Sequence, residues 1–373
     1  MQRSVLIVGG GIGGLTAAIA LCRQGFAVQI VERDPHWSVY GVGIIQQMNV
    51  VRAMQQIGVL DAYLARARGF DRTTIFVGPG GIKEASFETP RLAGPDYPSN
   101  AGIRRKDLQQ VLGDAARAAG AAIRLGVTVE GMADDGAGVD VTLSDGTSAR
   151  FDCVIGADGI YSRTRAAILP DAPKPRYTGQ WVWRYNLPLP ADLDGIHIFA
   201  GPCNAGLVPM SDSLMYLFLV SEEPGTDFLP VEGAAAAMRA RARMPAPQLL
   251  PHLAAITEDT GVVARPIETI FLEHDPWHAG RVALLGDAVH ASSPHLAQGA
   301  GMAIEDGLVL AEELARHDTP EDAFTAYRAR RFERVRHVVL NSLKIGDMQM
   351  GRIPPFDVGA LTGQTIGMMA GPI

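Results

Sequence analysis

The chain has 373 residues, of which 47% are hydrophobic and 20% charged, a composition typical of a globular protein with a substantial core. The formal net charge of −7 disfavours a nucleic-acid partner, because binding to phosphates requires a basic surface. The 3 cysteines provide no disulfide framework, and no apolar run is long enough to cross a bilayer. No signal peptide is apparent before the first strand, so we expect a soluble cytoplasmic protein.

The first predicted elements are a strand, a glycine-rich turn and a helix. An apolar, β-branched run over residues 5–8 predicts a buried parallel strand, and apolar residues recur at helical spacing over residues 15–22. Gly9, Gly11 and Gly14 lie between them with the spacing G-x-G-x-x-G, which allows a tight turn, close approach of a pyrophosphate and tight helix packing. We expect the pyrophosphate at the helix N-terminus, where free N–H groups favour an anion.

A second predicted strand, over residues 27–31, ends at Glu32, which is placed to accept hydrogen bonds from an adenosine ribose. The order of strand, glycines, helix, strand and acid predicts a dinucleotide site, whereas a purely structural glycine turn leaves Glu32 unexplained. A glycine-rich loop over residues 41–46 follows, either as a plain connector or as part of the site. It leads into a predicted helix over residues 47–57.

Residues 71–101 depart from this pattern with a strand, a glycine turn and a proline-rich segment, which suggests an excursion from the nucleotide domain. Arg104 and Arg105 then precede an amphipathic helix that ends at Gly120. Short strands separated by Asp-Gly turns predict a β-meander, with strands over residues 123–125, 127–130, 139–143 and 147–151.

The second half of the chain combines a strand-rich region with two further buried strands. The first buried strand ends at Asp158 and Gly159, and residues 176–270 predict a mixed sheet in which aromatic residues alternate around Trp183. The remaining predicted elements are a buried strand over residues 281–285 followed by Asp287, helices over residues 300–314 and 319–343, and a tail of unclear structure from residue 346.

Three separated motifs occur together in this order. They are the glycine turn with Glu32, the run C-V-I-G-A-D-G-I-Y-S-R-T-R over residues 153–165, and the run G-R-V-A-L-L-G-D-A-V-H over residues 280–290, which continues to Asp306. On these motifs the chain resembles the single-component FAD-dependent aromatic hydroxylases, the p-hydroxybenzoate hydroxylase-like flavoprotein monooxygenases. The form P-x-x-A-Q-G-A is most similar to members that act on small hydroxylated acids, such as 6-hydroxynicotinate 3-monooxygenase and 3-hydroxybenzoate 6-hydroxylase.

Two positions depart from the family pattern. Leu296 and Ala297 precede Gln298 where many members carry two glycines. Ile45 stands where some pyridine hydroxylases carry a histidine, which disfavours a pyridine substrate.

The resemblance implies an α/β fold: a Rossmann-like FAD-binding domain with a β-meander, a mixed β-sheet substrate domain and C-terminal helices. We expect a discontinuous FAD-binding domain. The expected boundaries are 1–70, 102–175 and 275–345 for the FAD-binding domain, 71–101 and 176–274 for the substrate domain, and 346–373 for the tail.

The resemblance also implies contacts with FAD from residues of all three motifs. Glu32 would bind the ribose, Asp287 the ribityl chain, and the helix that begins at Gly299 would stabilise negative charge at the flavin pyrimidine edge. The full set of expected cofactor-binding residues is Gly9, Gly11, Ile12, Gly13, Gly14, Glu32, Arg33, Gly43, Arg105, Val129, Asp158, Asp287, Gly299, Ala300, Gly301 and Met302.

In this family NADH or NADPH reduces the flavin, O2 reacts at flavin C4a, and one oxygen atom is transferred to an electron-rich ring. His295 and Tyr216 are the candidates for a catalytic proton relay, unless they make an ordinary loop hydrogen bond and a core contact. Arg184 is the candidate counter-charge for a substrate carboxylate, unless it forms a structural salt bridge. The expected substrate-binding residues are Trp183, Arg184, Tyr216, His295 and Gln298, and no metal site is expected.

The expected partners are a small aromatic substrate and O2, with no nucleic acid or membrane, in a monomer or homodimer. Two other functions remain open from the sequence: a flavin-dependent reductase or dehydrogenase on the same fold, and a non-catalytic FAD-binding redox protein. No second dinucleotide fingerprint is present to favour a two-nucleotide reductase.

Overall fold

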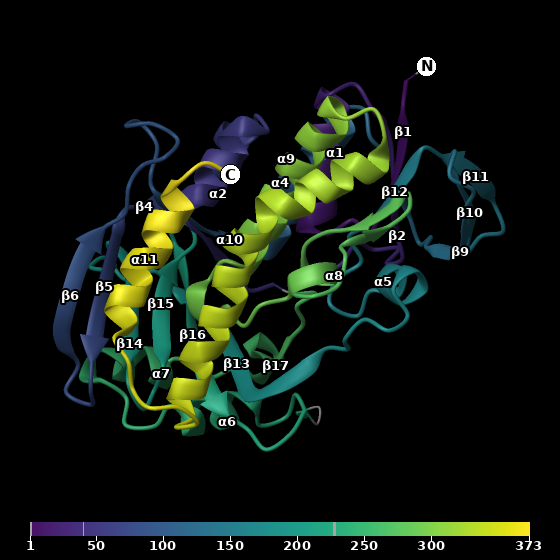
Figure 1. The fold of residues 1–373 in the computed structure, drawn as a ribbon. Helices are drawn as coiled ribbons and strands as arrows, with labels where there is room; N and C mark the ends of the chain where they lie inside the picture. The colour runs from purple at the N-terminus through teal and green to yellow at the C-terminus, as the bar shows by residue number, and fades with distance from the viewer. Residues whose placement is uncertain (1, 40, 227–228) are drawn as a thin grey trace.

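A computed structural model describes residues 2–39, 41–226 and 229–373, and its strands form two large sheets and two small ones (Figure 1). The six-stranded sheet has the order β18-β19-β12-β1-β2-β8 and is parallel except for β18. Its strands come from three separate stretches of the chain: β1 (Ser4–Val8), β2 (Ala27–Glu32), β8 (Ala122–Leu125), β12 (Cys153–Gly156), β18 (His278–Ala279) and β19 (Val282–Leu284).

Both faces of this sheet are covered, which is why β1 reads as a continuous apolar run. Val5 and Ile7 belong to the main core, which includes residues of the helices α1 (Ile12–Arg23), α4 (Arg105–Ala118) and α9 (Gly299–Arg316). Leu6 and Val8 instead join a cluster with the three-stranded meander, which consists of β9 (Val129–Asp134), β10 (Val139–Leu143) and β11 (Ser148–Phe151).

The predicted four-stranded meander is wrong at its first strand, residues 123–125, which belongs to β8 of the six-stranded sheet. β8 pairs in parallel with β2, from Gln29 opposite Ala122 to Glu32 opposite Leu125. The helix α4 immediately precedes β8, so the chain enters β8 by a helical crossover and not by a tight turn.

The seven-stranded sheet has the order β17-β13-β16-β15-β14-β5-β6 and carries the strand-rich part of the chain (Figure 1). One face is covered by α6 (Ala234–Arg241), η1 (Pro247–Leu249) and α7 (Leu250–Ala254). The strands are β5 (Arg72–Val77), β6 (Ile82–Glu88), β13 (Arg176–Pro188), β14 (Gly195–Ala200), β15 (Ala205–Pro209), β16 (Leu214–Glu222) and β17 (Val263–Thr269).

The remaining elements connect the two sheets. A small sheet of β3 (Gly43–Gln46), β7 (Asn100–Arg104) and β4 (Arg68–Phe70) lies beside α2 (Met48–Gln56), which is followed in the chain by α3 (Leu60–Leu64). α5 (Arg163–Ile168), α8 (Asp287–His290), η2 (Asp259–Gly261) and η3 (Pro294–Leu296) are short. Nowhere in the described ranges does a helix combine the length and apolar character needed to span a bilayer.

The chain ends in two helices, α10 (Pro320–Gln349) and α11 (Val358–Ala370). As predicted, the Thr319 hydroxyl caps α10 by accepting a hydrogen bond from the Asp322 N–H (3.3 Å). α11 occupies the tail whose structure was unclear from the sequence, and it packs beside α10 (Figure 1).

Candidate active site

One cavity of about 1410 Å³ opens between the glycine turn, the seven-stranded sheet and the C-terminal helices. Gly11, Ile12 and Gly13 line one end, and residues of β13, β14 and β16 line another. The candidate site is therefore assembled from segments far apart in the sequence.

The glycine turn has the geometry that a bound pyrophosphate requires. Gly9 has a φ of +112°, and a Cβ atom on Gly14 would lie 2.1 Å from the Gly9 carbonyl oxygen, so both positions exclude side chains. Gly11 is the N-cap of α1, and no side chain in the described part of the chain caps this helix. Its first-turn N–H groups are thus available to an anion.

The ribose-binding candidate, Glu32, is held by the backbone of its own turn. Its carboxylate accepts hydrogen bonds from the N–H groups of Gly10 (2.8 Å) and Asp34 (2.9 Å). The Trp37 indole N–H donates to the Gly10 carbonyl (2.7 Å), a neighbour that the sequence analysis missed because a lone loop aromatic carries no pattern. Within the described part of the chain, Glu32, Arg33 and Val129 are not among the cavity-lining residues.

Asp287 follows β19 at the carboxyl end of the parallel sheet, where open α/β sheets bind their ligands. Its side chain opens onto the cavity although protein surrounds it, and this burial raises the pKa of the carboxyl. Arg105 also lines the cavity and opposes this shift. A carboxylate in this position suits a ligand with hydroxyl groups.

Asp158, an expected contact of the cofactor, makes hydrogen bonds within its own segment of the chain. Its carboxylate accepts hydrogen bonds from the Ser162 hydroxyl (2.5 Å) and from the N–H (2.9 Å) and hydroxyl (3.0 Å) of Thr164. Asp158 therefore stabilises the start of α5, while its neighbours Ala157 and Gly159 line the cavity.

At the start of α9, Gly299 and Ala300 line the cavity, whereas Gly301 and Met302 do not. The hydroxyl of Ser292 is buried and has no hydrogen-bond partner among the described residues, and a Cβ atom on Gly299 would lie 3.3 Å from it. An orphaned hydroxyl beside an exposed helix N-terminus fits a polar ring edge, such as the pyrimidine edge of a flavin.

Gln298, an expected substrate contact, is 1% exposed and faces away from the cavity. Its amide bonds to Asn49 and to Gln47, which itself lines the cavity. We therefore correct its role: Gln298 positions the loop before α9 and is not among the described residues that line the cavity.

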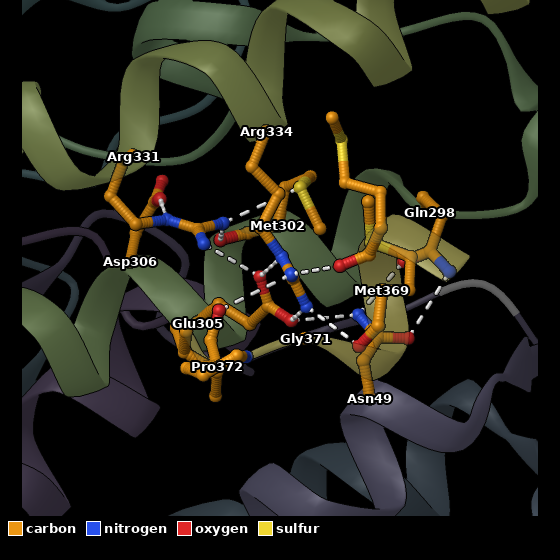
Figure 2. Close-up of polar contacts among 12 residues, drawn as sticks. Asn49, Gln298, Met302, Glu305, Asp306, Arg331, Arg334, Met369, Gly371 and Pro372 are labelled. Atoms are coloured by element: carbon orange, nitrogen blue, oxygen red, sulfur yellow. Dashed lines mark hydrogen bonds and ion pairs between the residues drawn. The ribbon is translucent and has the colours of Figure 1, made fainter. Parts of the chain in front are cut away.

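Behind α9 lies a buried ion-pair network (Figure 2). Arg331 donates to Glu305 (2.6 Å) and to Asp306 (2.8 Å), and all three side chains have 0% exposure. Arg334 bonds to both oxygens of Glu305. Asp306 also accepts the N–H of Gly286 (3.0 Å), so the network holds the turn that carries Asp287.

The network also sets the charges of its carboxyl groups. Burial alone would raise the pKa of Asp306, but His290, whose Nε2 lies 2.6 Å away, and Arg331 hold it at about 2. His290 is thus part of the buried network and has a structural role.

On the other side of the cavity, the pleat of β13 decides which side chains reach the site. Val182 and Arg184 line the cavity, whereas Trp183 has 0% exposure on the opposite face, where its indole N–H bonds to Ser221. The expectation that Trp183 lines the substrate pocket is therefore wrong. Tyr216 of β16 lines the cavity, and burial raises its pKa, so the phenol is neutral near pH 7.

Arg184 is the principal cation on this wall. Burial, together with the charge of Arg105, lowers its pKa to about 10, and Tyr216 partly opposes the shift. Within the described ranges no carboxylate pairs with Arg184.

His295 lines the cavity with both ring nitrogens occupied. Nε2 lies 3.0 Å from Gln349 Oε1, which also accepts from Gln180, and Nδ1 lies 2.9 Å from the Ser293 hydroxyl. This arrangement assigns the ring proton to Nε2, so Nδ1 accepts from Ser293. Burial lowers the pKa of His295 to about 4, so the imidazole is neutral at physiological pH.

Together these features fit FAD. The uncapped helix N-terminus at Gly11 matches the pyrophosphate. The cavity-facing Asp287 matches the ribityl chain, and the unpaired Ser292 hydroxyl matches the flavin ring edge.

Comparison with known proteins agrees with this interpretation. The family model described as FAD binding domain matches residues 2–342. Aurachin C monooxygenase/isomerase of Stigmatella aurantiaca is 32% identical over 92% of this chain and 89% of that protein. 6-Hydroxynicotinate 3-monooxygenase of Pseudomonas fluorescens is 31% identical over 90% of this chain and 89% of that protein. The crystal structure of Klebsiella pneumoniae HpxO with FAD and uric acid has a TM-score of 0.83 and 27% identity, covering 99% of this chain and 92% of that one.

The chain therefore belongs to the FAD-binding-domain family and, within it, to the flavoprotein monooxygenases of the aromatic hydroxylase type. The fold class expected from the sequence is confirmed by the sheets and helices described above and by the agreement with HpxO.

Proposed function

We propose that the protein uses NADH or NADPH and O2 to hydroxylate a small aromatic substrate that carries an anionic group. The observation that carries this proposal is Arg184, a guanidinium on the cavity wall with no carboxylate partner in the described ranges and with the like charge of Arg105 nearby. A buried cation without a counter-charge is costly, so a ligand carboxylate or phenolate there is favoured.

Bound FAD would supply the electron transfer and the activation of oxygen, while the protein binds and orients the substrate. Arg184 would pair with the substrate anion, and the neutral hydroxyl of Tyr216 would orient the hydroxylated ring. A substrate hydroxyl would pass its proton to Ser293, whose own proton moves to Nδ1 of His295. Because His295 holds a proton weakly, this relay is transient, and substrate ionisation would depend mainly on Arg184.

The relatives support an aromatic substrate without identifying it. The Pseudomonas fluorescens enzyme is named for a hydroxylated pyridine acid, and the HpxO crystals contain uric acid. Both compounds are small rings that ionise, which is consistent with a cationic wall.

The proposal is tested with the FAD-loaded enzyme, NADH or NADPH, and ¹⁸O2, against a panel of hydroxybenzoates and hydroxylated heteroaromatic acids. We expect at least one compound to stimulate oxidation of the nicotinamide and to acquire one ¹⁸O atom. Stimulated oxidation without incorporated oxygen would instead indicate a reductase or dehydrogenase. No oxidation with any compound would favour the non-catalytic redox protein.

Arg184→Gln tests the anion contact. The variant should raise the Kd of the aromatic acids by at least tenfold and leave FAD affinity unchanged, because charge-assisted hydrogen bonds are worth about 1.5–3 kcal/mol. Arg163→Gln, a substitution of an exposed arginine outside the cavity lining, is the control.

A further inference from the structure

The end of the chain contributes a wall of the cavity that the cofactor and the anion contact do not use. α10 supplies Ile345, Met348 and Gln349, and α11 supplies Val358, Gly359, Thr362, Thr365 and Ile366, together with Leu296 of η3. None of these residues is charged. This arm, bounded by η3, α10 and α11, contrasts with the wall that carries Arg184.

Contacts within the arm leave it little capacity for hydrogen bonding. Leu296, Ile345 and Leu361 form a buried apolar cluster against which Val358 packs. The Thr362 hydroxyl donates to the Val358 carbonyl of its own helix (2.8 Å), so the hydrogen of this hydroxyl is already used. The Thr365 hydroxyl likewise donates to the Leu361 carbonyl (2.9 Å), and Gln349 Oε1 accepts from Gln180 (3.1 Å). The surface that remains for a ligand is mainly methyl and methylene groups.

α11 is fixed at both ends through its backbone. At its start the Asp357 carboxylate accepts a hydrogen bond from the Ala360 N–H (2.8 Å). At its end Arg334 donates to the carbonyls of Met368 and Met369, and Arg52 donates to those of residues 369–371. Figure 2 shows Arg334 between Glu305 and the Met369 carbonyl. Backbone contacts at both ends therefore help to fix the position of the wall, in addition to the packing of its apolar side chains.

We propose that the arm between η3, α10 and α11 receives an apolar substituent, such as a linear alkyl chain, on the aromatic substrate, and that α11 determines substrate specificity. The inference rests on the proposed function for the identity of the ring. Its physical basis is continuity: the arm belongs to the same cavity as the flavin and anion positions, and burial of a methylene group in an apolar site improves affinity about fourfold.

The test is a binding titration on the FAD-loaded enzyme without nicotinamide, in which binding is detected by the change in flavin absorbance. The probes are 4-alkyl and 5-alkyl 2-hydroxybenzoates with chains from methyl to hexyl. In one of the two series the Kd should fall about two- to fourfold per methylene until the arm is filled. A Kd that is independent of chain length in both series would overturn the proposal.

Thr362→Trp should fill the arm, and Gln364→Trp on the exposed face of the same helix is its matched control. Thr362→Trp should raise the Kd of the hexyl compound to near that of the methyl compound, while the methyl Kd and FAD content stay within twofold of wild type. Equal weakening of both compounds would contradict the specificity role.

Two further measurements keep the outcomes distinct. If Thr362→Trp does not retain FAD, Met348→Ala is used as the test variant. Its smaller side chain enlarges the arm, so the chain length with the lowest Kd should increase. An unchanged chain length would overturn the proposal. Hydroxylation is assayed separately with ¹⁸O2. Chain-length-dependent binding, with no oxygen incorporated into these probes or into any compound of the panel, would refute the proposed function and leave the specificity wall intact.

Discussion

At the scale of single residues, Asp287 has the clearest expected effect on the cofactor. Its carboxylate opens onto the cavity at the end of the parallel sheet, and Asp287→Ala would leave a ribityl hydroxyl without its acceptor. FAD binding should weaken by roughly 1–3 kcal/mol, measured by fluorescence titration of the apoprotein. Asp212→Ala, which removes an exposed ion pair with Arg68, should leave FAD affinity unchanged. Equal affinities in wild type and Asp287→Ala would remove Asp287 from the site.

His295 should make the stability of the protein fall in mild acid. Burial lowers its pKa from 6.5 to about 4, so between these pH values the unfolded chain binds a proton that the folded protein does not. At 1.36 kcal/mol per unit of pKa difference, the free energy of unfolding should fall by about 3 kcal/mol between pH 7 and pH 4. We expect the free energy of unfolding of His295→Gln, measured in urea, to fall less between pH 7 and pH 4 than that of the wild type, by roughly this amount. The same substitution at the exposed His274 should not change the pH profile, and identical profiles for wild type and His295→Gln would contradict the burial of a neutral imidazole.

The sequence could identify several residues of the cavity but not the direction in which each side chain points. Arg184, Tyr216 and His295 were all expected and all line the cavity. Trp183 was wrong because strand alternation shows which residues share a face and does not show which face meets the cavity. Gln298 was misassigned because its bonds to Asn49 and Gln47 join residues about 250 positions apart, which no local pattern predicts.

At the scale of elements, the buried network that joins α9 to α10 should dominate stability. Arg331→Met would leave the carboxylates of Glu305 and Asp306 buried with fewer counter-charges, which typically costs 3–5 kcal/mol. The free energy of unfolding in urea provides the measurement. Arg336→Met on the same helix is the control, because Arg336 is 46% exposed and its pair with Glu273 is worth about 1 kcal/mol or less. A loss below 1 kcal/mol for Arg331→Met would contradict this role of the network.

Elements with strong local signals were predictable, and elements fixed by tertiary contacts were not. The N-cap at Thr319 and the proline after it locate the start of α10. α11 has the sequence VGALTGQTIGMMA, whose glycines have low helix propensity, so the sequence gives little reason to expect a helix. Its carbonyls are bound by Arg52 and Arg334, and such contacts from distant helices stabilise it.

At the scale of the whole molecule, the cavity-lining residues link segments that lie far apart in the chain. Gly11 and Arg105 come from two stretches of the chain and Asp287 and Gly299 from a third, and the six-stranded sheet is likewise assembled from separate segments. We propose on this basis the discontinuous FAD-binding domain of residues 1–70, 102–175 and 275–345. A ligand that binds only the folded state stabilises it by mass action, about 2.7 kcal/mol at a concentration 100 times its Kd.

Hydrogen exchange of the apoprotein with and without FAD tests this division. Residues 9–16, 104–112 and 284–304 should gain protection together, because each contains cavity-lining residues assigned to the cofactor. The meander strands β10 and β11 are the internal control, since Val139–Leu143 and Ser148–Phe151 contribute no residue to the cavity lining. Protection confined to residues 9–32 would show that FAD is held by the N-terminal turn alone. If the meander gained as much protection as these segments, FAD would be stabilising the whole fold and the result would not locate its site. Binding to the three segments must protect the amides nearest the ligand most.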